Sequence, residues 1–261
     1  MLALIAGQGD LPRAVAKAAP EPVLVCALAH ALPDRVEPDL VFRLERLGGF
    51  LRALRRRGVT RICMCGRVTR PALSLRALDL PTLRLLPRVV RALRRGDDGA
   101  LRIVIGILEG AGFQVLGAHE AAPDLLPPAG ILTAAQPGPE AAALALLGDR
   151  VSAAQGRADL GQAAVLRGGR VAAQEDDAGT DAMLARLAPG QGGLLYKAPK
   201  PGQDRRADLP VIGPATVAGS ARAGLDGLVI EAGGVMVLDR DRVLRDLDAA
   251  GMYLWVRERG A

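Results

Sequence analysis

The first half of the chain alternates short apolar runs with longer amphipathic stretches. The apolar runs lie at residues 2–6, 23–28, 60–65 and 113–117, and stretches with helical periodicity lie at about 11–19, 48–57, 83–95 and 98–110. Parallel strands joined by crossover helices give this alternation. The pattern predicts an N-terminal α/β domain over residues 1–122, built on a Rossmann-like parallel sheet.

The second half has a less regular pattern, which predicts a mixed α/β domain over residues 140–261. Gly168-Gly169 joins two apolar runs and is typical of a two-residue hairpin, and the glycines at 233–234 predict a second one. Helices are expected near 140–155, 180–187, 214–223 and 240–249, with Thr180 as an N-cap. The segment 123–139 holds five prolines and has no sustained period, so it is expected to be a linker.

Length and apolar content are sufficient for two buried cores, since the chain has 261 residues, half of them hydrophobic. No apolar stretch reaches the roughly 18 residues that span a bilayer, and the N-terminus does not resemble a signal peptide. We therefore expect a cytoplasmic protein. Cys26, Cys63 and Cys65 fall in predicted core strands, which favours buried thiols over a zinc site. The two histidines, His30 and His119, fit neither a zincin motif nor a catalytic triad.

The net charge of +6 is unevenly distributed, because residues 43–95 contain fifteen arginines and only two acids, Glu45 and Asp79. Such a face could meet nucleic acid, an anionic membrane or an acidic substrate. No aromatic residue follows Phe50 in this arginine run, so stacking platforms for bases are missing. Attraction of phosphate groups is the better interpretation, and no nucleic-acid partner is expected.

Two motifs of the N-terminal half lie at predicted carboxyl ends of strands, where open α/β sheets bind ligands. The turn Gly7-Gln8-Gly9-Asp10-Leu11 follows the first strand, and its N–H groups could face an anion. Pro12 replaces the last glycine of the dinucleotide fingerprint and argues against NAD binding. Arg67 and Arg70 follow the third strand and could bind phosphates in a bidentate manner.

The loop 197–213 mixes rare lysines with arginines and carboxylates. The chain has three lysines, and two of them, Lys197 and Lys200, stand in this loop beside Arg205, Arg206, Asp204 and Asp208. Cations that neutralise phosphates next to a carboxylate that could bind metal or act as a base are what phosphoryl chemistry requires. Further carboxylates of this half are Asp159, Glu175, Asp176, Asp177 and Asp181. Oxygen ligands of this kind suit Mg²⁺ or Mn²⁺.

A family resemblance rests on ordered motifs along nearly the whole chain. These motifs are LIAGQGDLP (4–12), GRVTRP (66–71), GDD (96–98), GAHE (117–120), DLGQ (159–162), GTDAML (179–184), KAPKPGQDRRADLPVIG (197–213) and EAGGVMVLD (231–239). On them the chain resembles the LpxI-type UDP-2,3-diacylglucosamine pyrophosphatases, enzymes of lipid A biosynthesis in Gram-negative bacteria. The resemblance implies hydrolysis of the substrate diphosphate, with attack at the sugar-side phosphorus, to UMP and 2,3-diacylglucosamine 1-phosphate (lipid X).

The resemblance also implies Mg²⁺ as cofactor, with Mn²⁺ as the alternative ion, and substrate binding between two domains. Carried over by motif, Asp208 is the central catalytic acid and metal ligand. The residues expected to contact substrate are Gly9, Asp10, Leu11, Arg67, Gln162, Thr180, Asp181, Lys197, Lys200 and Thr216. The family's usual E-G-T-D reads here Ala178-Gly179-Thr180-Asp181, so no role is transferred to the nearby Glu175.

A lipid substrate implies transient contact with the inner membrane surface, for which residues 43–95 are the predicted docking region. A homodimer is also compatible with the sequence. Two other functions remain open from the residues alone. The glycine turn could belong to a nucleotide-dependent oxidoreductase, and the arginine density could belong to a non-enzymatic RNA-binding module.

Overall fold

A computed structural model describes residues 1–69, 74, 77–93, 97–158, 160–190, 192–202, 204–206 and 208–260. The chain forms two compact units, Met1–Asp124 with Gln203–Asp208, and Leu125–Gly202 with Leu209–Ala261. We call them the N-terminal and the C-terminal unit. The segment that ends at Asp208 therefore belongs to the N-terminal unit, although it lies inside residues 140–261, which the sequence pattern assigned to the second domain.

The N-terminal unit is built on a five-stranded parallel sheet in the order β3-β2-β1-β4-β5. Its strands are β1 (Leu2–Ala6), β2 (Val23–Leu28), β3 (Leu40–Phe42), β4 (Arg61–Cys65) and β5 (Gln114–Leu116). This order confirms the predicted Rossmann-like sheet. The order of the strands reverses between β1 and β4, because β2 and β3 lie on one side of β1 and β4 and β5 lie on the other. Ligands of open α/β folds bind at the carboxyl edge beside such a switch point.

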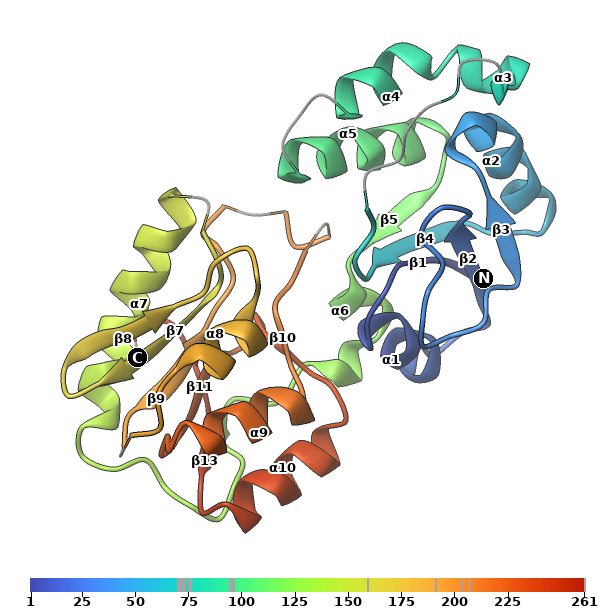
Figure 1. Ribbon diagram of the computed structural model, residues 1–261. Coiled ribbons are helices and arrows are strands. Elements are labelled where there is room, and N and C mark those ends of the chain that lie inside the picture. The colour runs from blue at the N-terminus through green and yellow to red at the C-terminus, as the bar shows by residue number, and fades with distance from the viewer. Residues whose placement is uncertain are drawn as a thin grey trace. The chain divides into compact units, whose positions relative to one another are not determined.

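Helices cover the sheet of the N-terminal unit. They are α1 (Leu11–Ala18), α2 (Leu47–Arg56), α3 (Leu80–Leu83), α4 (Leu86–Leu93), α5 (Asp97–Gly110) and α6 (Ala118–Ala121), with short 3₁₀ turns at Leu44–Arg46 and Pro123–Leu125. Apolar residues of α2 and α5 form one core with the sheet, and α4 packs on α5 (Figure 1). The helix predicted at 83–95 is thus two helices, α3 and α4, interrupted between Leu83 and Leu86.

The C-terminal unit contains a six-stranded mixed sheet in the order β6-β13-β11-β9-β7-β8. Its strands are β6 (Gly130–Ile131), β13 (Tyr253–Arg257), β11 (Gly227–Glu231), β9 (Leu194–Lys197), β7 (Ala163–Arg167) and β8 (Arg170–Gln174). Strands β13, β11 and β9 are parallel, whereas β6, β7 and β8 each run antiparallel to a neighbour. The mixed α/β sheet expected from the sequence is confirmed.

Helix α7 (Ala141–Arg157) covers one face of this sheet, and α8 (Thr180–Arg186), α9 (Pro214–Arg222) and α10 (Arg240–Ala249) cover the other (Figure 1). Two apolar cores follow, one on each face. On the α7 face, a Cβ at Gly148 would lie 2.3 Å from the Tyr196 ring, so the glycine lets helix and strand approach closely. The Tyr196 hydroxyl donates to Asp149 at 2.5 Å, and Asp149 also pairs with buried Arg257 at 3.0 Å.

Three local expectations differ from the structure. The glycines at 233–234 do not close a hairpin, because β12 (Met236–Val237) pairs in parallel with β10 (Val211–Ile212) in a separate small sheet. Thr180 is the first residue of α8 and not its N-cap; Gly179 holds that position, at φ +88°. The proline-rich segment 123–139 contains β6, whose pairing with β13 makes it part of the C-terminal sheet.

Among the described residues, no helix combines the length and the apolar character that crossing a bilayer requires.

Candidate functional site

Strand register brings three polar positions of the C-terminal unit to one edge of its sheet. Ala163 of β7 lies opposite Lys197, the last residue of β9. The Glu175 N–H donates to the Ala163 carbonyl at 3.0 Å, and the Ala198 N–H donates to the Gln162 carbonyl at 3.1 Å. The neighbours Gln162, Glu175 and Lys197 therefore share the carboxyl edge of the parallel strands, where ligands of α/β sheets bind.

A chain of hydrogen bonds joins these residues through Thr180 at the start of α8. The Lys197 Nζ donates to the Thr180 Oγ1 at 2.6 Å, and that hydroxyl donates to the Glu175 Oε1 at 3.0 Å. The second carboxylate oxygen of Glu175 accepts from the Gln162 N–H at 2.9 Å. We call Lys197, Thr180, Glu175 and Gln162 the lysine relay.

Burial makes the relay costly to break. Lys197 is 6% exposed and Thr180 is also 6% exposed, and an ammonium group removed from water needs hydrogen-bond acceptors to stay charged. Glu175 can approach because of Gly161, where a Cβ would lie 2.4 Å from the Glu175 Cγ. The hydroxyl of Thr180 thus links the Lys197 ammonium to the Glu175 carboxylate.

The remaining candidates of this unit flank the relay in the chain. The Thr216 Oγ1, near the start of α9, donates to the Asp181 Oδ1 at 3.3 Å, so these two predicted contacts are neighbours across α8 and α9. Lys200 is half-buried. The next residue, Pro201, packs against α7: a Cβ at Gly156 would lie 2.5 Å from the Pro201 Cδ.

In the N-terminal unit, the ends of β1 and β4 meet backbone to backbone. Gln8 and Arg67 exchange two N–H···O bonds of 2.9 Å. A Cβ at Gly7 would lie 2.5 Å from the Arg67 carbonyl oxygen, and one at Gly66 would lie 2.8 Å from the Pro12 Cγ. These two glycines are therefore required by close approach, and Pro12, which departs from the dinucleotide fingerprint, is buried beside Gly66.

The backbone N–H of the turn at Gly9 is bound to a carboxylate of the same N-terminal unit. The Gly9 N–H, which was expected to face an anion, donates to the Asp34 Oδ1 at 2.8 Å. This hydrogen bond lowers the pKa of Asp34, with a smaller contribution from Arg35. Arg35 lies between Asp34 and Asp10, at 3.7 and 3.6 Å. Leu11 follows as the first residue of α1.

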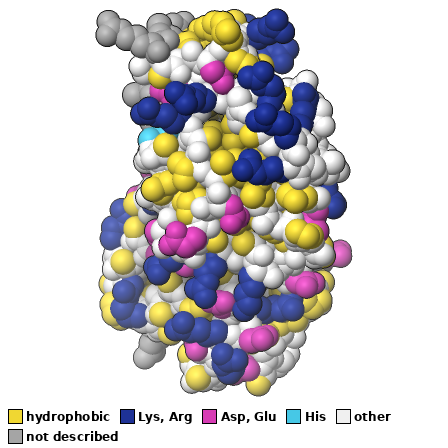
Figure 2. Space-filling model, turned by 90° about the vertical axis from the view of Figure 1, so that its right-hand side faces the viewer, with side chains coloured by type: hydrophobic (Ala, Val, Ile, Leu, Met, Phe, Trp, Pro, Cys, Tyr) yellow, Lys and Arg dark blue, Asp and Glu magenta, His cyan; other side chains and the backbone are white. Residues whose placement is uncertain are grey.

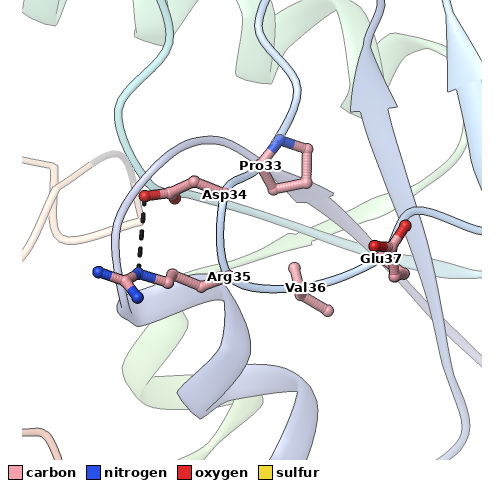
Figure 3. A pocket seen from close by; sticks show the side chains of 5 residues that line it. All are labelled: Pro33, Asp34, Arg35, Val36 and Glu37. Carbon is pink, nitrogen blue, oxygen red and sulfur yellow. Dashed lines mark ion pairs between the residues drawn. The ribbon is translucent and has the colours of Figure 1, made fainter.

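Residues 33–37 also line a pocket of about 360 Å³ (Figure 3). The close-up shows the Asp34 carboxylate and the Arg35 guanidinium directed toward each other on one side of this loop. Carboxylate and guanidinium together offer acceptors and donors to a polar ligand such as a nucleoside. The sequence reasoning did not single out this loop.

The segment that carries Asp208 is held within the N-terminal unit by Arg206. This guanidinium binds Asp204 through its Nη2 at 2.8 Å and the Glu109 Oε1, on α5, through its Nη1 at 2.6 Å. The hydrogen bond from Arg206 lowers the pKa of Asp204. The Asp208 N–H donates to the Asp204 carbonyl at 3.3 Å, and the Asp208 side chain is exposed. Arg206 is thus an anchor for this segment and not a cation reserved for phosphate.

The GAHE motif at the end of β5 lies beside this segment. A Cβ at Gly117 would lie 2.9 Å from the Arg205 carbonyl oxygen, and the Gly117 N–H donates to the Glu120 Oε2 at 2.7 Å. Burial lowers the pKa of His119 from its usual 6.5, and Arg205 contributes in the same direction against Glu120. Within the described part of the chain, the buried Nδ1 of His119 has no hydrogen-bond partner.

Other expected chemistry has a simpler outcome. Cys26 and Cys63 are buried, as expected for structural thiols, and burial raises the pKa of Cys26 to about 12. Among the described residues, no group of three or more His, Cys, Asp or Glu side chains is arranged to hold a metal ion. Arg70 and Asp159 lie outside the described residues.

Comparison with known proteins agrees with this two-unit architecture. Residues 1–125 match the LpxI N-terminal domain, and residues 128–255 match the LpxI C-terminal domain. The chain belongs to the LpxI family. It is also 39% identical, over 97% of its length and 96% of the relative's, to the UDP-2,3-diacylglucosamine pyrophosphatase LpxI of Caulobacter vibrioides.

Within this LpxI-family fold, the sequence did not predict the contacts of three residues that the structure places at the carboxyl edges. Glu175 was named only among the carboxylates that could bind a metal, and its link to Thr180 was not expected. Asp34 is in a loop without a recognisable motif, and His119 was considered only as a metal ligand or catalytic-triad member. A buried lysine in need of an acceptor was the one signal that pointed toward an acid such as Glu175.

Proposed function

We propose that the protein hydrolyses the diphosphate of UDP-2,3-diacylglucosamine to UMP and 2,3-diacylglucosamine 1-phosphate, in the cytoplasm at the inner membrane face. Membership of the LpxI family and the named activity of the Caulobacter relative support this reaction. The observation that carries it in this chain is the lysine relay, because a buried, hydrogen-bonded ammonium at a sheet edge suits a phosphate oxygen. The reaction belongs to the biosynthesis of lipid A.

The segment 197–213 carries both kinds of group that the proposed reaction needs, cations and a carboxylate. In the proposed step, the Asp208 carboxylate accepts a proton from water while the water oxygen forms a bond to phosphorus. The bridging P–O bond breaks, and Lys197 and Lys200 stabilise the negative charge on the phosphate that leaves. The relay holds the Lys197 ammonium in place through Thr180, so little reorganisation accompanies the charge shift.

Mg²⁺ is the proposed cofactor, with Asp208 as the protein ligand. Mg²⁺ commonly binds one or two carboxylates and completes its shell with water and substrate phosphates, so one protein carboxylate can suffice in a site assembled with substrate. Such an ion would neutralise charge on the diphosphate oxygens. Removal of divalent ions with EDTA should abolish UMP release, and Mg²⁺ or Mn²⁺ should restore it; full activity in EDTA would show that the hydrolysis is metal-independent.

The direct test is incubation with detergent-dispersed UDP-2,3-diacylglucosamine and detection of UMP. Asp208→Asn should reduce kcat by about a thousandfold or more, as loss of a group that acts in the transition state does. Asp177→Asn, which makes the same charge change at an exposed position, should leave the rate unchanged. Thermal unfolding should match the parent in both variants. Near-normal turnover by Asp208→Asn would refute the assigned role.

Water labelled with ¹⁸O identifies the phosphorus that is attacked. Attack at the sugar-side phosphorus, which the family resemblance implies, places the label in 2,3-diacylglucosamine 1-phosphate. Attack at the nucleotide-side phosphorus places it in UMP. The two products have different masses, so one mass spectrum of a single-turnover reaction decides between them.

A further inference from the structure

The α2 helix presents a cluster of guanidiniums outward from the N-terminal unit. Leu47, Phe50, Leu51 and Leu54 of α2 are buried, which directs the opposite side of the helix to solvent. There Arg52, Arg55 and Arg56, with Gly49, line a pocket of about 470 Å³. In the described part of the chain, neither Arg52 nor Arg56 forms an ion pair with a carboxylate within 4.0 Å, although the Asp79 carboxylate lies near enough to Arg52 to interact with its charge.

The two acids of this arginine-rich region are both bound to backbone N–H groups. Glu45 is buried and accepts from the Ser74 N–H at 3.1 Å. Asp79 binds two backbone donors, the Gly49 N–H at 3.0 Å and the Thr82 N–H at 2.8 Å. The Asp79 carboxylate therefore links α2 to α3, the Glu45 carboxylate is buried against the Ser74 backbone, and arginines outnumber acids on the outer surface.

Exposed leucines adjoin this positive surface. Helix α3 packs on α2, since the Gly48 N–H donates to the Thr82 Oγ1 at 2.8 Å. Yet Leu80 at the start of α3 is 81% exposed, and Leu83 is 46% exposed. Arg84, Arg88 and Arg91 continue the exposed basic positions along the chain into α4. In Figure 2, basic side chains gather beside hydrophobic ones over the part of the unit that carries α2 to α4.

We propose that this α2–α4 surface, made of Arg52, Arg56, Leu80, Leu83 and Arg88, docks on anionic phospholipid membranes. Basic side chains are attracted to the negative headgroup layer, and exposed leucines beside them can enter the acyl boundary. A nucleic acid would match the charge but not the leucines, and the phenylalanines in contact with this region, Phe50 and Phe113, are buried and cannot stack on bases. The proposal rests on the proposed function in one respect: a diacyl substrate resides in a membrane.

The test is co-sedimentation of the full-length protein with phospholipid vesicles that contain no substrate. Vesicles with about one-third phosphatidylglycerol should bind the protein, vesicles of phosphatidylcholine alone should not, and high salt should release it. Arg52→Gln with Arg56→Gln should lower the partition coefficient by about fivefold for each charge removed. Leu80→Ser with Leu83→Ser should lower the partition coefficient by a factor that moderate changes in salt concentration do not alter, because apolar insertion is not screened.

A matched control removes the same charges elsewhere. Arg242→Gln with Arg245→Gln alters two exposed arginines of α10 and should leave vesicle binding unchanged. Equal binding by the α2 variant and the parent, or binding that ignores lipid charge, would overturn the proposal. So would tight binding of single-stranded RNA that depends on the arginines alone while vesicles fail to bind.

The two proposals fail separately. Vesicle binding is measured without substrate, so it can be lost or found whatever the enzyme hydrolyses. Conversely, UMP release from detergent-dispersed substrate should be the same in the parent, the α2 variant and the α10 variant, because no membrane is present. Absence of UMP release in the parent would end the proposed function and leave the vesicle result intact.

Discussion

The carboxyl edges of the two sheets are built by different means. In the C-terminal unit, side chains define the edge: a buried ammonium, a hydroxyl and a carboxylate are joined by hydrogen bonds. In the N-terminal unit, the backbone defines it: glycines let β1 and β4 meet at main-chain distance, and exposed charges lie around them. The first arrangement holds the Lys197 ammonium in place, and the second holds the main chain of β1 against that of β4.

This difference teaches where substitutions should act. A rigid, desolvated cation contributes mainly when charge develops, so its loss should reduce kcat. A close main-chain contact tolerates no added atom, so even a methyl group should affect folding of the unit around it. The segment of Asp204 to Asp208 belongs by its contacts to the N-terminal unit, and Arg206 anchors it there through ion pairs at its surface.

Among the substitutions that test this contrast, loss of the Lys197 ammonium should have the largest effect, and the effect should be on kcat. Lys197→Met keeps most of the buried volume and removes the charge, and kcat should fall by about 10²–10³ because an oriented donor to the reacting phosphate is lost. KM should change much less. Lys17→Met, the same substitution at a lysine of α1, should have no effect on kcat. A rise in KM at constant kcat would show that Lys197 binds the ground state equally well, which contradicts the proposed role.

A methyl group at Gly7 should have the next largest effect, and on stability. Gly7→Ala would place a Cβ 2.5 Å from the Arg67 carbonyl oxygen, and overpacking of this kind costs about 1–3 kcal/mol. Hydrogen exchange of the β1 and β4 amides should accelerate accordingly. Gly106→Ala on α5 adds the same methyl group where no atom lies within 4 Å and should be neutral or slightly stabilising. Unchanged hydrogen exchange in Gly7→Ala would mean that the main chain of β1 and β4 moves apart at little energetic cost.

Regular structure could be predicted because its causes are local. The strands at 2–6 and 23–28 follow from continuous apolar runs, and they agree with the structure. β3 and β6 were missed because they are short, and β6 also has a pairing partner, β13, that is distant in sequence. The predicted hairpin at 233–234 failed for the same reason, since the choice of β10 as the partner of β12 is tertiary.

The site was predictable as far as its motifs reach. Gln162, Thr180 and Lys197 were named from motifs, and the structure joins them, but the acid that links them, Glu175, was named only as one of several possible metal-binding carboxylates. Its position beside Lys197 depends on the register of β7 with both β8 and β9 and on the space that Gly161 leaves, none of which a motif records. Likewise, the ion pairs of Arg206 could not be read from an arginine-rich loop in which every cation looks alike.

Neutralising Glu175 should have a smaller effect than removing Lys197. Glu175→Gln keeps an acceptor for the Thr180 hydroxyl but loses the charge, and hydrogen bonds to charged groups contribute about 1.5–3 kcal/mol. Turnover should therefore fall about tenfold or somewhat more. Asp177→Asn, two residues away and exposed, is the matched control. If both variants behave like the parent, the relay is structural only. A loss as large as that of Lys197→Met would mean that Glu175 acts directly on substrate.

Acidification should have the smallest effect, a decrease in the free energy of unfolding. It should act on the N-terminal unit alone, because the two histidines of the chain, His30 and His119, both lie there. Burial lowers the pKa of His119, so the unfolded chain takes up a proton near pH 6.5 while the folded protein does so only at lower pH. The unfolded state then binds more protons, and the free energy of unfolding should decrease as the pH falls below about 6.5.

Melting curves between pH 7.5 and 5.5 should show this decrease by circular dichroism, above the range in which carboxylates take up protons. His119→Gln should flatten the dependence, whereas His30→Gln, at an exposed position, should retain it. Because Trp255, the one tryptophan of the chain, lies in the C-terminal unit, its fluorescence separates the two units. A pH dependence that persists in His119→Gln would assign the effect to other groups and would remove His119 as the feature that makes the N-terminal edge sensitive to acid.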